Sequence, residues 1–99
     1  METKPITFIA TFSGGAGAVT FTGVDGLSED KTFTCDPENP VSPQSFNTDQ
    51  SCGPQSVILG GTAPNGGDIT VDVKDAQNNL LTTGTYKGLF VGEELDYTI

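Results

Sequence analysis

The segment DITVDVKDAQNN, residues 68–79, places three aspartates and two asparagines within twelve positions. Carboxylate and amide oxygens are ligands that calcium prefers, at about 2.3 to 2.6 Å from the ion. In an extended strand, however, Asp68 and Asp72 stand about 13 Å apart, because each residue advances the chain by about 3.3 Å. These two carboxylates therefore cannot chelate one ion, and they belong to the outward face of a strand.

Asp75 and Asn78 follow that strand, where the chain has to turn. Short carboxylate and amide side chains favour turns, because they cap their own backbone and tolerate a positive φ. The same two residues could serve as calcium ligands if a carboxylate from elsewhere in the chain completed the site. A turn is the favoured interpretation, and calcium is the only cofactor that the sequence suggests.

Cys35 and Cys52 are the only cysteines; Cys35 directly precedes a proline-rich segment over 36–54, and Cys52 lies near its end. Closing a loop of this length stabilises a fold by about 3 kcal/mol in the chain-entropy model. A zinc site needs more ligands than two thiolates, and the Cys-X-X-Cys spacing of a redox pair is absent. We therefore predict a Cys35–Cys52 disulfide, with two unbonded buried thiols as the alternative. A disulfide would place the mature protein outside the reducing cytosol.

The residues that common catalytic mechanisms need are missing from this chain. It has no histidine, the usual general base and the partner of nucleophilic serine or cysteine. The glycine-rich segments SGGAG and LGGTAPNGG lack the Lys-Ser/Thr pair of a phosphate-binding loop. Carboxylates gather at 93–96, but glycoside hydrolysis would also need a cleft around two of them. We predict that the protein is not an enzyme.

The net charge of −9 comes from thirteen acidic residues against four lysines, with no arginine. Such a surface repels nucleic acid and anionic lipid and keeps a small domain in solution. No apolar run approaches the roughly 18 residues of a membrane helix, and METKPITFIA lacks the basic flank and long apolar stretch of a signal peptide. We expect neither nucleic-acid binding nor membrane insertion.

The chain of 99 residues suits one domain over 1–99. Its hydrophobic residues alternate with period two, and turn residues recur at the spacing typical of an all-β sandwich or barrel. We expect about seven antiparallel strands, over 5–12, 18–24, 31–35, 56–61, 68–74, about 79–86 and 94–99, with 86–91 as a further short strand. The alternation predicts a core of Ile6, Phe8, Val19, Phe21, Phe33, Val57, Leu59, Ile69, Val71, Val73, Leu95 and Tyr97.

The segment ITVDVKDAQNNLLTTGTY, residues 69–86, resembles the hairpin of bacterial immunoglobulin-like domains. In that hairpin a strand ends in an Asp-Ala pair, a Gly/Asn turn follows, and a second strand resumes. The resemblance implies an immunoglobulin-like antiparallel β-sandwich, a fold that serves as spacer or binding module in bacterial adhesins, cell-surface enzymes and phage virion proteins. Gln77 and Asn78 stand where a glycine is common, and the resemblance carries over no functional residue.

Residues 36–54 hold four of the six prolines and little apolar material apart from Val41 and Phe46. The composition predicts a long proline-rich loop without a strand, and such loops in compact domains are usually functional or disordered. We expect Val41 and Phe46 to be apolar anchors that contact another protein subunit. The alternative is that Phe46 only plugs one end of the sandwich.

These observations favour a non-enzymatic structural or adhesive module that contacts other protein subunits on a cell surface, in a filament or on a virion exterior. The alternative is a secreted lectin-like or lipoprotein domain whose ligand is a carbohydrate or whose binding depends on calcium. A carbohydrate site usually presents an aromatic platform, and the chain has no tryptophan and only two tyrosines. Either function places the protein outside the cell.

Overall fold

The computed structural model describes residues 2–36, 38 and 43–99, and this part of the chain contains strands and turns but no helix. The strands are β1 (Thr3–Ser13), β2 (Gly17–Thr22), β3 (Lys31–Cys35), β4 (Gln44–Ser51), β5 (Pro54–Thr62), β6 (Asp68–Lys74), β7 (Leu80–Tyr86) and β8 (Leu89–Thr98). The all-β prediction is confirmed, with eight strands in place of about seven.

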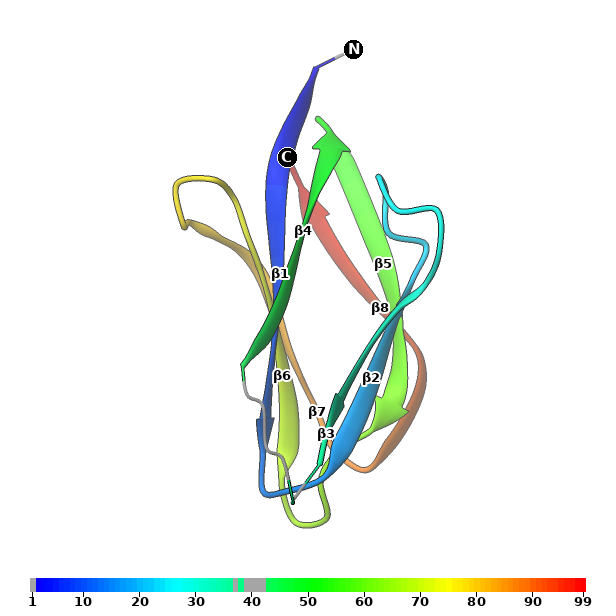
Figure 1. Ribbon diagram of the computed structural model, residues 1–99. Helices are drawn as coiled ribbons and strands as arrows, with labels where there is room; N and C mark the ends of the chain where they lie inside the picture. The colour runs from blue at the N-terminus through cyan, green and yellow to red at the C-terminus, as the bar shows by residue number, and fades with distance from the viewer. Residues whose placement is uncertain (1, 37, 39–42) are drawn as a thin grey trace.

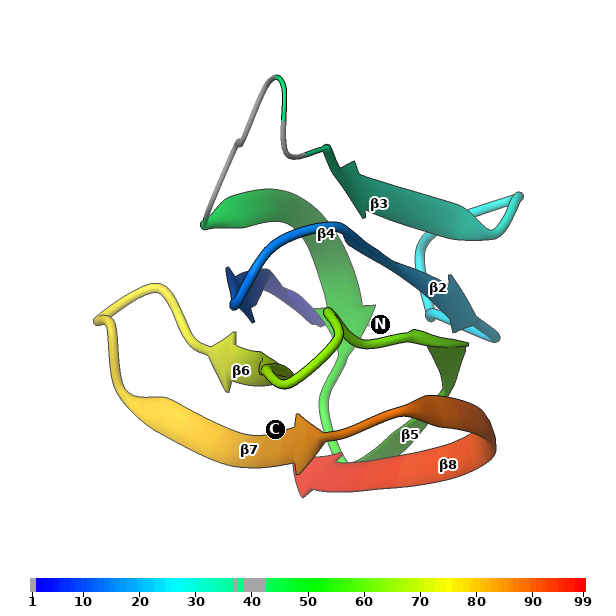
Figure 2. The ribbon, with the colours of Figure 1, turned by 90° about the horizontal axis from the view of Figure 1, so that it is seen from below.

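The strands form two antiparallel sheets that pack face to face (Figures 1 and 2). Sheet A has the order β4-β1-β6-β7, and sheet B has the order β3-β2-β5-β8. The β-sandwich is therefore confirmed. The chain passes between the sheets repeatedly, and only β2–β3 and β6–β7 are hairpins of neighbouring strands within one sheet.

The twelve predicted core residues are all buried, at 7% exposure or less. Phe8 lies at the centre of an aromatic cluster that joins the sheets, with ring centroids 4.9 Å from Phe46, 5.8 Å from Phe21 and 6.0 Å from Tyr97. Aromatic pairs in offset or edge-to-face contact add to the energy of area burial. The cluster therefore fixes how the two sheets face each other.

The segment 36–54 contains a strand that its composition concealed. β4 pairs antiparallel with β1, so that Phe46 lies opposite Phe8 and Thr48 opposite Ile6. The inward positions of β4 include the polar Thr48 and Gln50, both buried. Polar residues at inward positions hide the apolar alternation by which strands are recognised. The expected loop is therefore much shorter than nineteen residues.

The last strand, β8, is also longer than predicted, and it pairs with β5 over most of its length. A register shift lies between Leu59 and Gly61, opposite Gly92, which has a φ of 68°. A β-bulge inserts one extra residue and reverses which residues face inward. Phe90 and Leu95 consequently both face the core, although their spacing does not fit a single alternation.

Candidate functional site

Asp75 and Asn78 lie in the turn between β6 and β7, as predicted, and Asn78 has a φ of 65°. The Asp75 carboxylate accepts hydrogen bonds from the backbone amides of Gln77 (3.0 Å) and Asn79 (2.9 Å), and from the Asn79 side chain (3.2 Å). The Asn79 amide is the main reason that the pKa of Asp75 lies below its usual value. Both carboxylate oxygens thus hold the turn together, and no cluster of three or more His, Cys, Asp or Glu suited to a metal occurs among the described residues.

The predicted disulfide is wrong: Cys35 is a buried free thiol and Cys52 an exposed one. The Gln44 side chain donates a hydrogen bond to the Thr34 carbonyl (2.6 Å), so the start of β4 lies beside the end of β3. The other end of β4, Ser51, is seven residues beyond Gln44, or about 23 Å away at about 3.3 Å per residue. Cys52 comes directly after Ser51. A disulfide needs Cα atoms within about 4.4 to 6.8 Å. The extended β4 strand therefore keeps the two thiols apart.

Phe46 belongs to the aromatic cluster of the core rather than to a loop. Its ring stacks on Phe8 and lies 5.2 Å from Phe21 and 5.7 Å from Phe33. Packing inside the sandwich accounts for this side chain without a partner, as in the alternative in which it plugs the fold. Val41 lies outside the described residues, and its contact with a subunit stays a prediction.

A buried polar network, which the sequence did not reveal, fastens the turn after β2 to β4 and β5. The Tyr97 hydroxyl donates to the Gln50 side chain, whose amide donates to the Asp25 carbonyl (3.0 Å). The Asp25 carboxylate accepts from the Ser51 amide (2.9 Å) and the Gln55 side chain (3.0 Å). Within the described residues, every buried polar side-chain atom has a hydrogen-bond partner. These groups hold the turn after β2 against β4 and β5.

Burial is the main cause that raises the pKa of Tyr97 from 10.0 to about 12. The unfolded chain releases this proton near pH 10, whereas the folded chain holds it to about pH 12, so stability is complete below pH 10 and declines above it. We expect the free energy of unfolding to fall by about 2 to 3 kcal/mol between these pH values. Denaturant titrations should find a shallower decline in Tyr97→Phe, in which only Tyr86, whose pKa is also raised by burial, remains. Equal slopes would contradict this role of Tyr97.

Two carboxylates of the 93–96 cluster, those of Glu94 and Asp96, line a wide, open hollow of about 650 Å³ beside the start of β5. Glu94 and Asp96 are neighbours on the outer side of β8, and their shared hydrogen bond and Asp96's charge raise the pKa of the Glu94 carboxyl. Both side chains are exposed. Glycoside hydrolysis requires two carboxylates on either side of a bound sugar, and this pair instead lies side by side on one strand.

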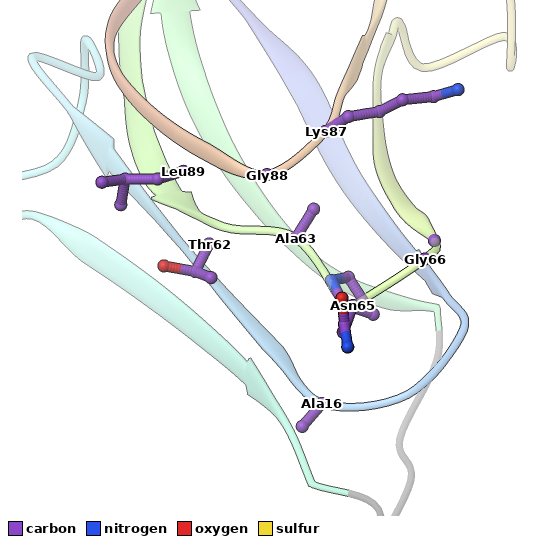
Figure 3. A pocket seen from close by; sticks show the side chains of 10 residues that line it. Ala16, Thr62, Ala63, Asn65, Gly66, Lys87, Gly88 and Leu89 are labelled. Carbon is purple, nitrogen blue, oxygen red and sulfur yellow. The ribbon is translucent and has the colours of Figure 1, made fainter.

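Three turns meet at the end of the sandwich opposite the chain termini and enclose an open hollow of about 640 Å³ (Figure 3). They include Ala16, Asn65 and Gly88. Lys87 and Leu89 point to opposite sides of the turn that carries them (Figure 3). Because the Lys87 side chain points away from the hollow, its ammonium group and the Asn65 amide do not face the same ligand.

The outer faces of the two sheets differ in charge. On sheet A three outward rows carry a charge, with Ile9 opposite Asp72, Thr7 opposite Lys74 and Ser13 opposite Asp68, and the row of Thr11, Thr70 and Thr85 carries none. In sheet B, one row joins Thr34, Ala18, Thr62 and Leu89, and the next joins Thr32, Thr20 and Gly60. We call this the neutral face of sheet B: Ala18, Thr20, Thr32, Thr34, Ile58, Gly60, Thr62, Leu89 and Val91. It ends at Ile58, which lies opposite Glu94 on β8.

The neutral face also carries three of the four exposed large hydrophobic side chains found among the described residues. Leu89 and Val91 are 79% and 80% exposed, and Ile58, on the neighbouring strand, is 37% exposed. Thr20 and Thr32 share a hydrogen bond of 2.9 Å between their hydroxyls. Their polar groups therefore satisfy each other, and the methyl groups and aliphatic side chains dominate this surface.

The chain was compared with protein-family models, curated proteins and solved structures, and none of them matches it. In the described part of the chain, no helix is long and apolar enough to cross a membrane.

Proposed function

We propose that this chain is a non-enzymatic structural or adhesive module that contacts another protein through the neutral face of sheet B. The observation that supports this proposal is the contrast between the two outer faces. Three outward rows of sheet A carry a charge, whereas Leu89 and Val91 stand almost fully exposed on the end of sheet B that is away from Glu94 and Asp96 and carries no charge. The centres of protein interfaces are depleted in charge, and clustered exposed apolar side chains mark interaction sites.

Other features of the molecule fit a module without chemistry of its own. The polar side chains buried in the described residues are hydrogen-bonded within the fold, and the acidic pair of Glu94 and Asp96 lies side by side on one strand in a wide, open hollow. Carbohydrate recognition finds less support, because Tyr97 is in the core and Tyr86 stacks on Phe90 at 4.9 Å. The resemblance at 69–86 supports a place on a cell surface, in a filament or on a virion exterior. The cysteines do not add to this support, because they form no disulfide that would require an oxidising environment.

Site-specific photocrosslinking in the cells that make the protein tests this proposal. A photoreactive phenylalanine at position 89 should form an adduct with a protein, because Leu89 is 79% exposed at the β8 edge of the neutral face. The same residue at position 85, an exposed position on the outer side of β7, serves as the matched control. It should form no adduct, because the outward rows on either side of it carry Asp68 and Asp72.

A further inference from the structure

The turn at 75–79 stands off from the body of the sandwich at the end where both termini lie (Figure 1). Between this turn and the first residues of β1 is a crevice of about 300 Å³. We call it the hairpin crevice. It lies at the opposite end of the molecule from the turn that precedes Leu89, so it is separate from the contact proposed above.

The floor of the hairpin crevice is aliphatic. It is made by Pro5, Ile6, Leu81 and Ile99. Ile6 is completely buried and offers no surface to a ligand, so the accessible aliphatic surface comes from Pro5, which is exposed, and from Leu81 and Ile99, which are partly buried against the core cluster. Because the floor is part of the packed interior, the crevice exists before any ligand arrives.

The polar groups of the crevice are the Lys4 ammonium, the Asp75 carboxylate and the Gln77 side-chain amide. Lys4 lies on the β1 side and Asp75 on the turn side. Lys4 is near enough to help lower the pKa of Asp75, yet no ion pair joins these two described side chains within 4.0 Å. An ammonium and a carboxylate that flank an apolar floor match the C=O and N–H groups of a peptide on either side of an aliphatic side chain.

Both walls are held in shape. The turn is fixed by the hydrogen bonds to the Asp75 carboxylate and by two backbone bonds of 3.0 Å, Asp75 to Asn79 and Asn78 to Asp75. The end of the chain is fixed by a reciprocal pair of backbone bonds between Gly53 and Ile99, 2.8 and 2.9 Å long. A preformed site loses little conformational entropy when it binds.

We infer that the hairpin crevice binds an aliphatic side chain of about leucine size, together with the adjoining peptide groups, on a partner polypeptide. The inference deepens the proposed function and rests on it only in taking the partner to be a protein. The lining contains no aromatic ring for a sugar to stack on, and Asp75 is its only carboxylate. The chemistry of the crevice therefore favours a peptide over a carbohydrate or a metal ion.

A titration of the full chain with N-acetyl-leucinamide, followed by ¹H–¹⁵N NMR, tests this inference. We expect saturable shifts at Ala76, Gln77, Leu81 and Ile99, with a Kd of about 1 to 10 mM for so small a ligand. N-acetyl-glycinamide, which lacks the side chain, should produce no saturable shift. Shifts that never saturate, or that are equal for the two ligands, would overturn the inference.

Two variants and one further ligand sharpen the test. Ala76→Trp places a large ring over the crevice at an exposed turn position, and it should weaken binding by at least about tenfold. The control is Asn65→Trp, an exposed turn residue at the opposite end, which should leave the Kd unchanged. Unchanged binding to Ala76→Trp would place the ligand elsewhere.

The further ligand is free leucine. If it binds about tenfold more tightly than N-acetyl-leucinamide, a polypeptide is rejected as the natural ligand. Because crosslinking at position 89 reports on the other end of the molecule, the two proposals can fail separately.

Discussion

Phe8→Ala should lower the free energy of unfolding by about 3 to 5 kcal/mol, the range for truncating a fully buried aromatic side chain. The Phe8 ring has no exposed surface and contacts aromatic rings from both sheets, those of Phe46, Phe21 and Tyr97. Its removal leaves a cavity that these rings cannot fill, because each is held by its own strand. Urea denaturation followed by circular dichroism measures the change.

Thr11→Ala is the matched control, since it lies on the same strand and faces solvent. It should change the stability by no more than about 0.5 kcal/mol. A similar loss in both variants would mean that β1 is sensitive along its whole length and that the aromatic cluster is not what joins the sheets.

Gly26→Ala should destabilise the fold by about 2 to 4 kcal/mol. Gly26 has a φ of 90°, and a Cβ atom there would lie 2.5 Å from the Asp49 carbonyl oxygen. The backbone of β4 cannot retreat, because it is paired with β1. The turn must therefore move, and the hydrogen bonds of Asp25 to Gln50, Ser51 and Gln55 would be lost with it.

Gly23→Ala is the matched control for Gly26→Ala. It measures the cost of the positive φ alone, without the clash that a Cβ atom at position 26 makes with Asp49. Gly23 has a φ of 73°, but a Cβ there would meet nothing within 4 Å. This variant should lose only about 1 to 2 kcal/mol, the cost of the left-handed conformation. Thermal or urea denaturation of the two variants should differ by at least about 1 kcal/mol. Equal losses would show that the Asp25 network adds little to stability.

The sequence predicted most of the fold because most strands alternate cleanly. In β1, Ile6 and Phe8 point inward while Thr7 and Thr11 do not, and period two follows directly from the pleat of a strand. The turn at Asp75 and Asn78 was predictable for a similar reason, since such side chains bond to their own backbone. These features depend on neighbours in the sequence.

What the sequence did not predict depends on contacts between distant segments. Gln50 is an inward residue of β4 only because Asp25 and Tyr97, far away in the chain, bond to its amide. The distance between Cys35 and Cys52 could not be judged without knowing that β4 is an extended strand between them. Flanking positions in a sequence are therefore weak evidence for a disulfide.

The neutral face of sheet B was hidden for the same reason. The row of Thr34, Ala18, Thr62 and Leu89 takes one residue from each of four strands, and only the register brings them together. The exposure of Val91 depends further on the bulge beside Gly92. A shift of one residue in a strand moves every side chain to the other face. Surface patches of this kind can be found only after the strands are paired.

The central claim, that the neutral face of sheet B contacts a protein, is tested most directly by comparing the photocrosslinks formed from positions 89 and 85. We predict a defined protein adduct from position 89, identified by mass spectrometry, and none from position 85. Protein adducts of equal yield from both positions would contradict the claim, because they would reveal contact without preference for the uncharged face. An adduct from position 85 alone would contradict it as well, and would move the contact to sheet A.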